Sequence, residues 1–234
     1  MSISDSSNPE NLQRMEVNGV KALVRPETSD PFVVREVIKG NEYRKLKIRA
    51  GDVIMDCGMN IGMFSIWAIG KGASKIHAYE PSHENYRLAV QNIEINGHSN
   101  QVETHEKAVV GTVDKTRNFS LNVHKNKGAH SLVEKKGRDS VTVQCINFQD
   151  EIRRIRPQIV KMDIEGGEYE CLMGATDFQG VREFIMEFHH AHLNDIYTRT
   201  KYKKVTDRLK EHFANVEYRE ETKKAWVTII YAWN

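Results

Sequence analysis

The sequence predicts an α/β fold built on a mostly parallel sheet, and three observations support this prediction. Short apolar runs that fit buried strands alternate with segments of helical periodicity along most of the chain. A glycine-containing turn at residues 56–62 follows one buried run, and an acidic residue, Glu80, ends the next. Two strand-like runs, 216–220 and 226–232, close the chain and predict a hairpin. Since 234 residues can bury a substantial core, we expect one domain of the larger α/β kind.

The composition is ordinary for a soluble domain, with 39% hydrophobic and 28% charged residues. The longest apolar stretch, around residues 61–69, is too short to span a bilayer, and residues 1–10 lack the basic and apolar regions of a signal peptide. We therefore expect a cytoplasmic protein. Three cysteines lack paired or metal-type spacing and are expected to be reduced core residues: Cys57, Cys145 and Cys171.

The segment before the glycine turn is expected to lie outside the main sheet. Residues 1–14 are polar and are predicted to be disordered. Residues 15–50 are predicted to form a lead-in segment that covers one edge of a ligand pocket. The single domain is therefore expected to span residues 15–234.

Residues 51–80 form a predicted unit of strand, glycine turn, helix and strand. Glycines let the backbone turn sharply against a ligand, and amides at the start of the following helix point at that ligand. Glu80, at the tip of the neighbouring strand, is placed to accept two hydrogen bonds from a ribose diol. The unit predicts a cofactor that contains adenosine, bound by Asp56, Gly58, Asn60, Gly62 and Glu80.

The spacing of the turn disfavours a dinucleotide. That fingerprint needs glycines at positions 58, 60 and 63, whereas this chain has Asn60 and Met63. The side chain of Met63 would obstruct the close helix packing that a pyrophosphate needs. An incidental turn in a buried unit is the alternative, and the acids at both strand tips disfavour it.

The elements between residues 81 and 140 follow from local signals. Pro81 and Ser82 open a helix that Asn96-Gly97 ends. Residues 101–110 are predicted to be the third strand, and the end of this strand is expected near the adenine, at Glu106, Lys107 and Ala108. Residues 111–140 hold seven basic and three acidic residues and few helix signals. They are predicted to be an inserted hairpin or flap, either a solvated loop or a contact for an anionic substrate.

The remaining elements complete the pattern. A strand at residues 141–152 leads into a short helix, and residues 159–163 form a fourth parallel strand before a helix that starts at Gly166-Gly167. Residues 183–190 are a fifth strand, and an amphipathic helical segment follows at 202–213.

Three short stretches together resemble one enzyme family. DCGMNIGMFS, KMDIEGGEYECL and MEFHH are similar to motifs of FkbM-family methyltransferases, and the resemblance runs from about Asp30 to the carboxyl terminus. It implies the Rossmann-like class I methyltransferase fold, with a seven-stranded, mostly parallel sheet and a C-terminal antiparallel hairpin. It further implies S-adenosyl-L-methionine as cofactor, S-adenosyl-L-homocysteine as product, and methylation of a hydroxyl on a sugar, glycan or small metabolite. By position, Asp163 would lie at the junction of cofactor and acceptor.

Methyl transfer to an alcohol needs an acceptor oxygen held in line behind the methyl carbon and a base within reach of its proton. Polar side chains lie where strands four and five end, at the edge where open α/β sheets bind ligands: Asp163, Glu187, His189 and His190. Imidazole has the ordinary pKa most suitable for a base near neutral pH, so His189 is the predicted base. Asp163, at the junction of cofactor and acceptor, is the second predicted catalytic residue. The alternative for His189 is a structural role, and Glu165 and Glu168 could merely favour the positive end of the next helix.

Three alternatives remain open at this point. A divalent metal at Asp163, Glu187 and His189 is disfavoured, because two strand tips are a thin ligand set, and no metal is predicted. A nucleic-acid methyltransferase could use the basic segment for phosphate contacts, but the fourth strand lacks the proline-proline-aromatic loop that stacks on a flipped base. A non-catalytic binding protein would have no use for both acidic strand tips. A small-molecule or glycan acceptor is the expected partner.

Overall fold

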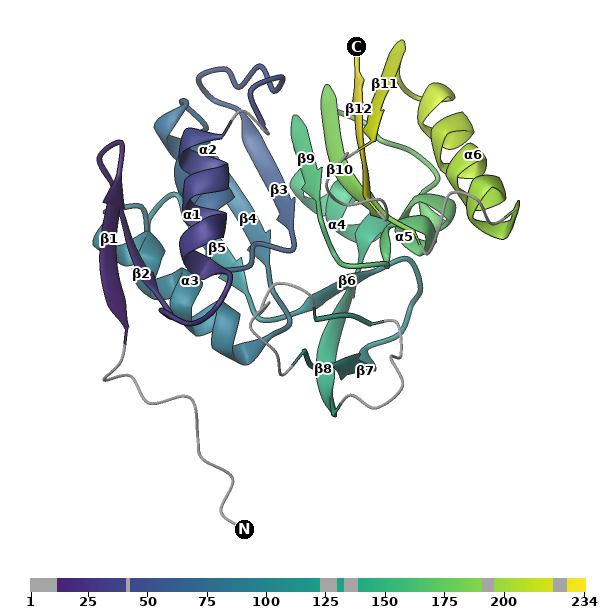
Figure 1. Cartoon of the computed structure of the whole chain (residues 1–234). Helices are drawn as coiled ribbons and strands as arrows, with labels where there is room; N and C mark the ends of the chain where they lie inside the picture. The colour runs from purple at the N-terminus through teal and green to yellow at the C-terminus, as the bar shows by residue number, and fades with distance from the viewer. Residues whose placement is uncertain (1–11, 41–42, 123–129, 133–138, 191–195, 221–226) are drawn as a thin grey trace.

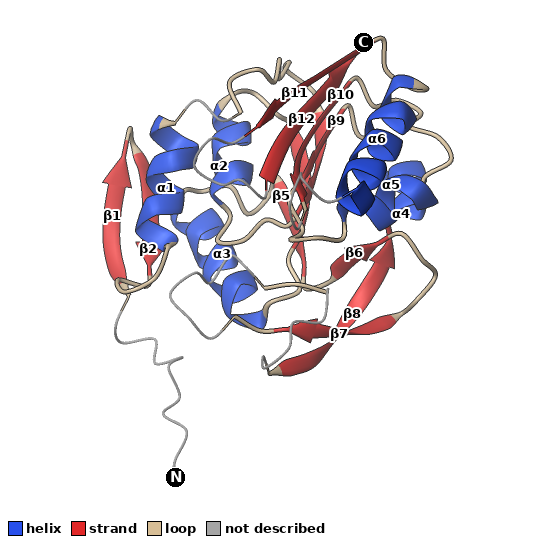
Figure 2. Cartoon of the chain, turned by 45° about the vertical axis from the view of Figure 1, so that its right-hand side comes forward, coloured by secondary structure: helices blue, strands red, loops and turns tan. Residues whose placement is uncertain are grey.

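The computed structural model describes residues 12–40, 43–122, 130–132, 139–190, 196–220 and 227–234. A central sheet divides the molecule, with helices α1, α2 and α3 on one face and α4, α5 and α6 on the other (Figures 1 and 2). One apolar core fills the space on each face of this sheet. The predicted three-layer α/β architecture is therefore confirmed.

The central sheet has seven strands in the order β11-β12-β10-β9-β3-β4-β5. β12 is antiparallel to both of its neighbours, whereas the pairs from β10 through β9, β3 and β4 to β5 are parallel. This arrangement confirms the predicted mostly parallel sheet with a C-terminal antiparallel hairpin. The strands are β3 Val53–Cys57, β4 Lys75–Tyr79, β5 Val102–His105, β9 Ile159–Met162, β10 Glu183–His189, β11 Asn215–Glu220 and β12 Val227–Trp233.

The helices lie between these strands. The ends of α3 follow the sequence signals, whereas the helical segment predicted at 202–213 is α6, which spans Ile196–Lys210. The side chain of Ser82 caps α3 by accepting a hydrogen bond from the Asn85 amide, and Gly97, just beyond the helix end, has φ +77°. α2 is apolar on all sides because it is enclosed by the sheet, α1 and α3. The helices are α1 Asp30–Lys39, α2 Met63–Gly70, α3 His83–Ile95, α4 Phe148–Ile155, α5 Glu168–Gly174 and α6 Ile196–Lys210.

The N-terminal segment packs on the helix layer, and its Tyr43 lines a small cavity together with Asp163 and Glu187. β1 (Gln13–Val17) and β2 (Val20–Val24) form a hairpin that packs on α3, where the Asn92 side chain bonds the backbone of Leu23. α1 packs on α2. β1 begins at Gln13, inside the range predicted to be disordered, while residues 1–11 lie outside the described part of the chain.

The predicted third strand is two strands in two different sheets. β5 ends at His105, and β6 (Ala108–Val110) pairs with β8 (Ser140–Asn147) in a three-stranded sheet completed by β7 (Thr116–Ser120). The prediction of one strand over 101–110 was wrong, because the chain leaves the central sheet at residues 106–107, where no glycine or proline marks a break. At this break the Lys107 amide bonds back to the carbonyl of His105, at 2.9 Å.

The basic segment 111–140 contributes β7 to this second sheet. Residues 123–129 and 133–138 lie outside the described residues, and with them five of the seven basic side chains. Of the two described ones, Arg117 forms ion pairs with Asp114 and Glu170 at 2.9 Å each. Its charge is therefore engaged within the molecule.

In the described part of the chain, no helix combines the length and the apolar character that crossing a membrane requires. All three cysteines are free thiols; Cys57 and Cys171 are buried and Cys145 is half-buried.

Candidate active site

The turn after β3 adopts a conformation that its residues allow. Gly58, Asn60 and Gly62 all have positive φ angles, of +82°, +50° and +86°. A Cβ on Gly58 would lie 1.8 Å from the carbonyl oxygen of Asp163. The tip of β9 therefore requires glycine at position 58, whereas the sequence analysis attributed this glycine to close approach of a ligand.

A buried ion pair supports the turn from below. Asp56 is fully buried, accepts a hydrogen bond from the Ser65 hydroxyl at 2.8 Å and lies 3.3 Å from Lys161 Nζ. Lys161 also donates to the carbonyl oxygen of Gly58 at 2.6 Å. Burial lowers the pKa of Lys161, but Asp56 and nearby carboxylates outweigh this effect and raise the pKa overall. Asp56 thus braces the turn. Lys161 was not predicted, although a charged residue inside an apolar strand indicates a buried partner.

Glu80 is held at the tip of β4 by two backbone amides. Its Oε2 accepts from the Asn60 amide at 3.0 Å, and its Oε1 accepts from the Ser82 amide at 2.9 Å. Burial raises the pKa of Glu80 to about 7, although both hydrogen bonds oppose the shift. Each carboxylate oxygen retains a second lone pair, so the group can still accept two hydroxyl protons.

A cavity of about 410 Å³, counted with its opening to solvent, lies over these strand tips. The cavity brings together five of the residues predicted to bind the cofactor. Among its other lining residues are Phe119 on β7, and His130 and Leu132 between β7 and β8. The five predicted residues are Gly58, Glu80, Lys107, Ala108 and Asp163.

The other predicted cofactor residues do not line this cavity. Gly62 packs on Ala89, and Glu106 bonds the exposed His83 at 2.8 Å. The backbone amide of Asn60 donates to Glu80. The side-chain Oδ1 of Asn60 is buried and has no hydrogen-bond partner among the described residues. A buried acceptor without a partner at this turn fits a ligand that carries donors, such as the ammonium group of an amino acid.

His189 is oriented by a buried carboxylate. Its Nδ1 lies 3.0 Å from Oε1 of Glu168, which is fully buried and also accepts from the amides of Ile164 and Gly166. The other ring nitrogen, Nε2, lies 3.9 Å from Asp163 and 3.6 Å from Glu165. Glu168 therefore does more than favour the positive end of α5, because it holds the ring that the sequence predicted to be catalytic.

The carboxylates around His189 change its acidity. Burial alone lowers the pKa of His189, but Glu168 outweighs this effect and, with Glu165 and Asp163, raises the pKa to about 10. In the ligand-free protein the ring is consequently an imidazolium at neutral pH. A base in this position is strong once it has lost its proton.

The same strand tips bring together the ligand set of the metal alternative. Ligand atoms of Asp163, Glu187 and His189 all lie within 4.8 Å of one another. His190 is separate from this group, since its Nε2 lies 3.1 Å from the Thr228 hydroxyl.

Comparisons with known proteins show the family of this chain. Residues 56–219 match the model of the Methyltransferase FkbM domain. The methyltransferase sdnD of Sordaria araneosa is 24% identical in an alignment 190 positions long. This alignment covers 67% of this chain and 73% of that protein.

Two solved structures share the fold. The methyltransferase FkbM from Methylobacillus flagellatus superposes with a TM-score of 0.51 at 17% identity, covering 78% of this chain, which spans only 44% of that one. TYW2 of M. jannaschii, solved with AdoMet, superposes with a TM-score of 0.57 at 12% identity, covering 95% of this chain and 85% of the other. The chain therefore belongs to the FkbM methyltransferase family and is an S-adenosylmethionine-dependent methyltransferase.

Proposed function

We propose that the protein transfers a methyl group to a hydroxyl oxygen of a sugar, a glycan or a small metabolite. The observation that carries this proposal is the Glu168–His189 pair, because Nε2 of His189 lies 3.9 Å from Asp163, a residue that lines the cavity. An alcohol needs a base to remove its proton as the new bond forms, and an imidazole held by a buried carboxylate is suited to that task.

In this proposal the cofactor lies across the strand tips. Glu80 accepts from the two ribose hydroxyls, residues 107–108 contact the adenine, and the turn with Asn60 Oδ1 receives the amino-acid end. When bound, S-adenosylmethionine supplies an electrophilic methyl group on a sulfonium. Asp163, which lines the cavity and lies beside His189, marks the boundary between cofactor and acceptor.

The protein's own groups then handle the acceptor proton. Nε2 of His189 takes the proton while the oxygen attacks in line, and Glu168 stabilises the imidazolium that forms. The His189 side chain is 14% exposed, so it can return the proton to solvent after product release. We assign two contributions to the protein. It holds the acceptor oxygen close to the methyl carbon, and it removes the acceptor proton.

The proposal is tested by incubating the full chain with S-adenosylmethionine and panels of hydroxyl and amine acceptors, followed by mass spectrometry. We expect only hydroxyl-bearing acceptors to gain the mass of one methylene, with the added methyl group on oxygen. Methylation of RNA or of amines, with sugars and phenols unmodified, would overturn it. A chelator added to the same assay tests whether Asp163, Glu187 and His189 act through a metal, since activity that survives chelation leaves the proton to His189.

Glu80→Gln is expected to weaken cofactor binding at least ~10-fold, because charge-assisted hydrogen bonds to two hydroxyls contribute ~1.5–3 kcal/mol each. The amide keeps the shape of the side chain. Calorimetric titration with S-adenosylhomocysteine measures the loss, and Glu84→Gln, a half-exposed glutamate on α3, is the matched control. Equal affinity in Glu80→Gln and the wild type would show that the ribose lies elsewhere.

The rate constant kcat/KM for the acceptor should rise with pH through an apparent pKa above the ordinary imidazole value of about 6.5. The reason is that the active base is neutral His189, whose pKa is raised to about 10 in the ligand-free protein. The sulfonium of bound S-adenosylmethionine adds a positive charge and should lower the pKa of His189 from about 10. Glu168→Gln removes the largest stabilising charge and should shift the profile to lower pH. A profile that is flat, or that Glu168→Gln moves upward, contradicts this assignment.

A further inference from the structure

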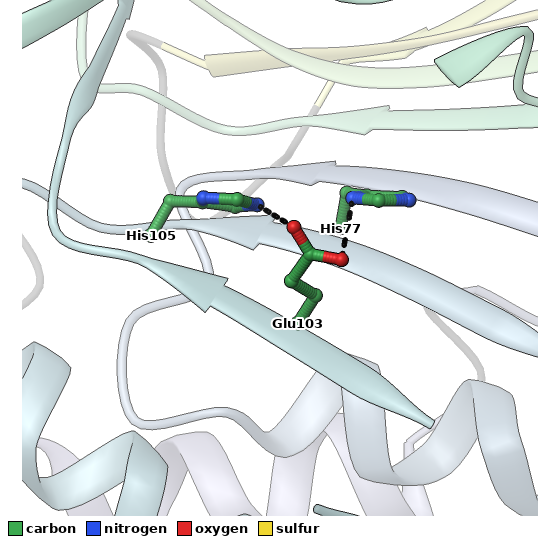
Figure 3. A group of neighbouring side chains, drawn as sticks. All are labelled: His77, Glu103 and His105. Carbon is green, nitrogen blue, oxygen red and sulfur yellow. Dashed lines mark ion pairs between the residues drawn. The ribbon is translucent and has the colours of Figure 1, made fainter. Parts of the chain in front are cut away.

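A second group of metal-binding side chains lies on the sheet, apart from the acidic residues around His189. His77 on β4 and Glu103 on β5 are directly paired across the strands, and His105 follows Glu103 on the same face. Ligand atoms of His77, Glu103 and His105 all lie within 4.8 Å of one another. Figure 3 shows the two imidazoles side by side, with the Glu103 carboxylate facing a nitrogen of each ring.

The distances fit a metal better than they fit hydrogen bonds. Glu103 Oε2 lies 3.6 Å from His77 Nδ1, and Oε1 lies 3.4 Å from His105 Nε2. Both ring nitrogens are buried and make no hydrogen bond to any residue that the structure describes. Bonds of 2.0–2.1 Å to tetrahedral zinc place neighbouring ligand atoms about 3.3–3.4 Å apart. The two nitrogen–oxygen separations, each to a different oxygen of Glu103, are close to this value.

The surroundings hold the two rings in place and keep them ready to coordinate. The His105 ring stacks on Tyr79, with centroids 4.6 Å apart, and it lies nearly parallel to the His77 ring. Burial lowers the pKa of both histidines, and neutral imidazole is the form that binds metals.

We propose that His77, Glu103 and His105 form a zinc site that ties the edge strand β5 to β4. Three protein ligands leave a fourth position for water, and the side chain of Glu103 is 44% exposed, so the site opens to solvent. Lys75 competes for this site, because its Nζ lies 3.5 Å from Glu103 Oε2. Its side chain is 38% exposed and can move away when the ion enters.

Calorimetric titration of the chelator-stripped full chain with zinc chloride tests the proposal. We expect His77→Gln and His105→Gln each to lose at least ~10-fold in zinc affinity, since removing even an outer partner of a ligand costs about 10–100-fold. His83→Gln is the matched control, because His83 also faces a glutamate but has no second histidine in its pair. His189→Gln should retain the binding, which separates this site from the acidic residues around the cavity.

A second measurement does not depend on loss of function. Lys75→Met should bind zinc more tightly than the wild type, a gain that a misfolded variant cannot produce. Zinc should also raise the melting temperature of the wild type but not that of His105→Gln, because a ligand stabilises the state that binds it. Zinc affinity that is absent in the wild type, or equal in the wild type, His77→Gln and His105→Gln, would overturn the proposal.

Discussion

His189→Ala should slow methyl transfer by ~10²–10⁴-fold, the usual contribution of a general base, while cofactor affinity changes little. The reason is geometric. Nε2 of His189 lies at the strand tips beside Asp163, whereas Glu80, the carboxylate that we propose for the ribose, follows β4. Single-turnover kinetics with an identified acceptor measure the rate, and titration with S-adenosylhomocysteine measures the affinity.

Two further variants define this expectation. His190→Ala is the matched control, because the neighbouring ring is engaged by Thr228 and should contribute little to the rate. Asp163→Asn should reduce both turnover and cofactor affinity, since Asp163 lines the cavity and lies beside His189. Full activity in His189→Ala would remove the histidine from the mechanism and leave catalysis to proximity and Asp163.

Lys161→Met should destabilise the fold by about 3–5 kcal/mol, the typical cost of leaving one partner of a buried ion pair without compensation. Lys161 and Asp56 are 4% and 0% exposed, so water cannot replace the lost charge. The Gly58 carbonyl also loses its lysine donor. Urea unfolding followed by circular dichroism measures the change in the free energy of unfolding.

The double variant Asp56→Asn/Lys161→Met should recover most of this loss, because neither charge then remains buried alone. Lys45→Met is the matched control. It breaks an ion pair with Glu217 in which both side chains are about half exposed, and such pairs contribute only about 0–1 kcal/mol. Equal losses in Lys45→Met and Lys161→Met would mean that the buried pair does not brace the turn.

The features that the sequence determined by itself are local in the chain. The glycine turn, the strand before it and Glu80 at the end of the next strand lie within residues 51–80, where spacing alone specifies the geometry. The helix ends at Ser82 and Gly97 follow from single residues with known capping roles. The number of strands in the sheet and its C-terminal hairpin followed from the family resemblance together with the alternating apolar runs, whereas the strand order came from the structure.

Features that depend on strand register needed the tertiary structure. Asp56 and Lys161 lie on strands β3 and β9, and their Cα atoms are register partners in the parallel sheet, which no local pattern shows. The break between β5 and β6 was missed because residues 103–107 contain no glycine or proline that would mark it.

The acidity of His189 was also decided by tertiary structure. Three carboxylates from the β9–α5 connection converge on a ring that comes from β10, and together they outweigh the effect of burial on its pKa. The sequence placed a histidine at the right edge of the sheet, but only the packing of Glu168 against it set its orientation and its charge. Electrostatic coupling depends on distance in space, and for these groups distance in space is set by the sheet and not by the sequence.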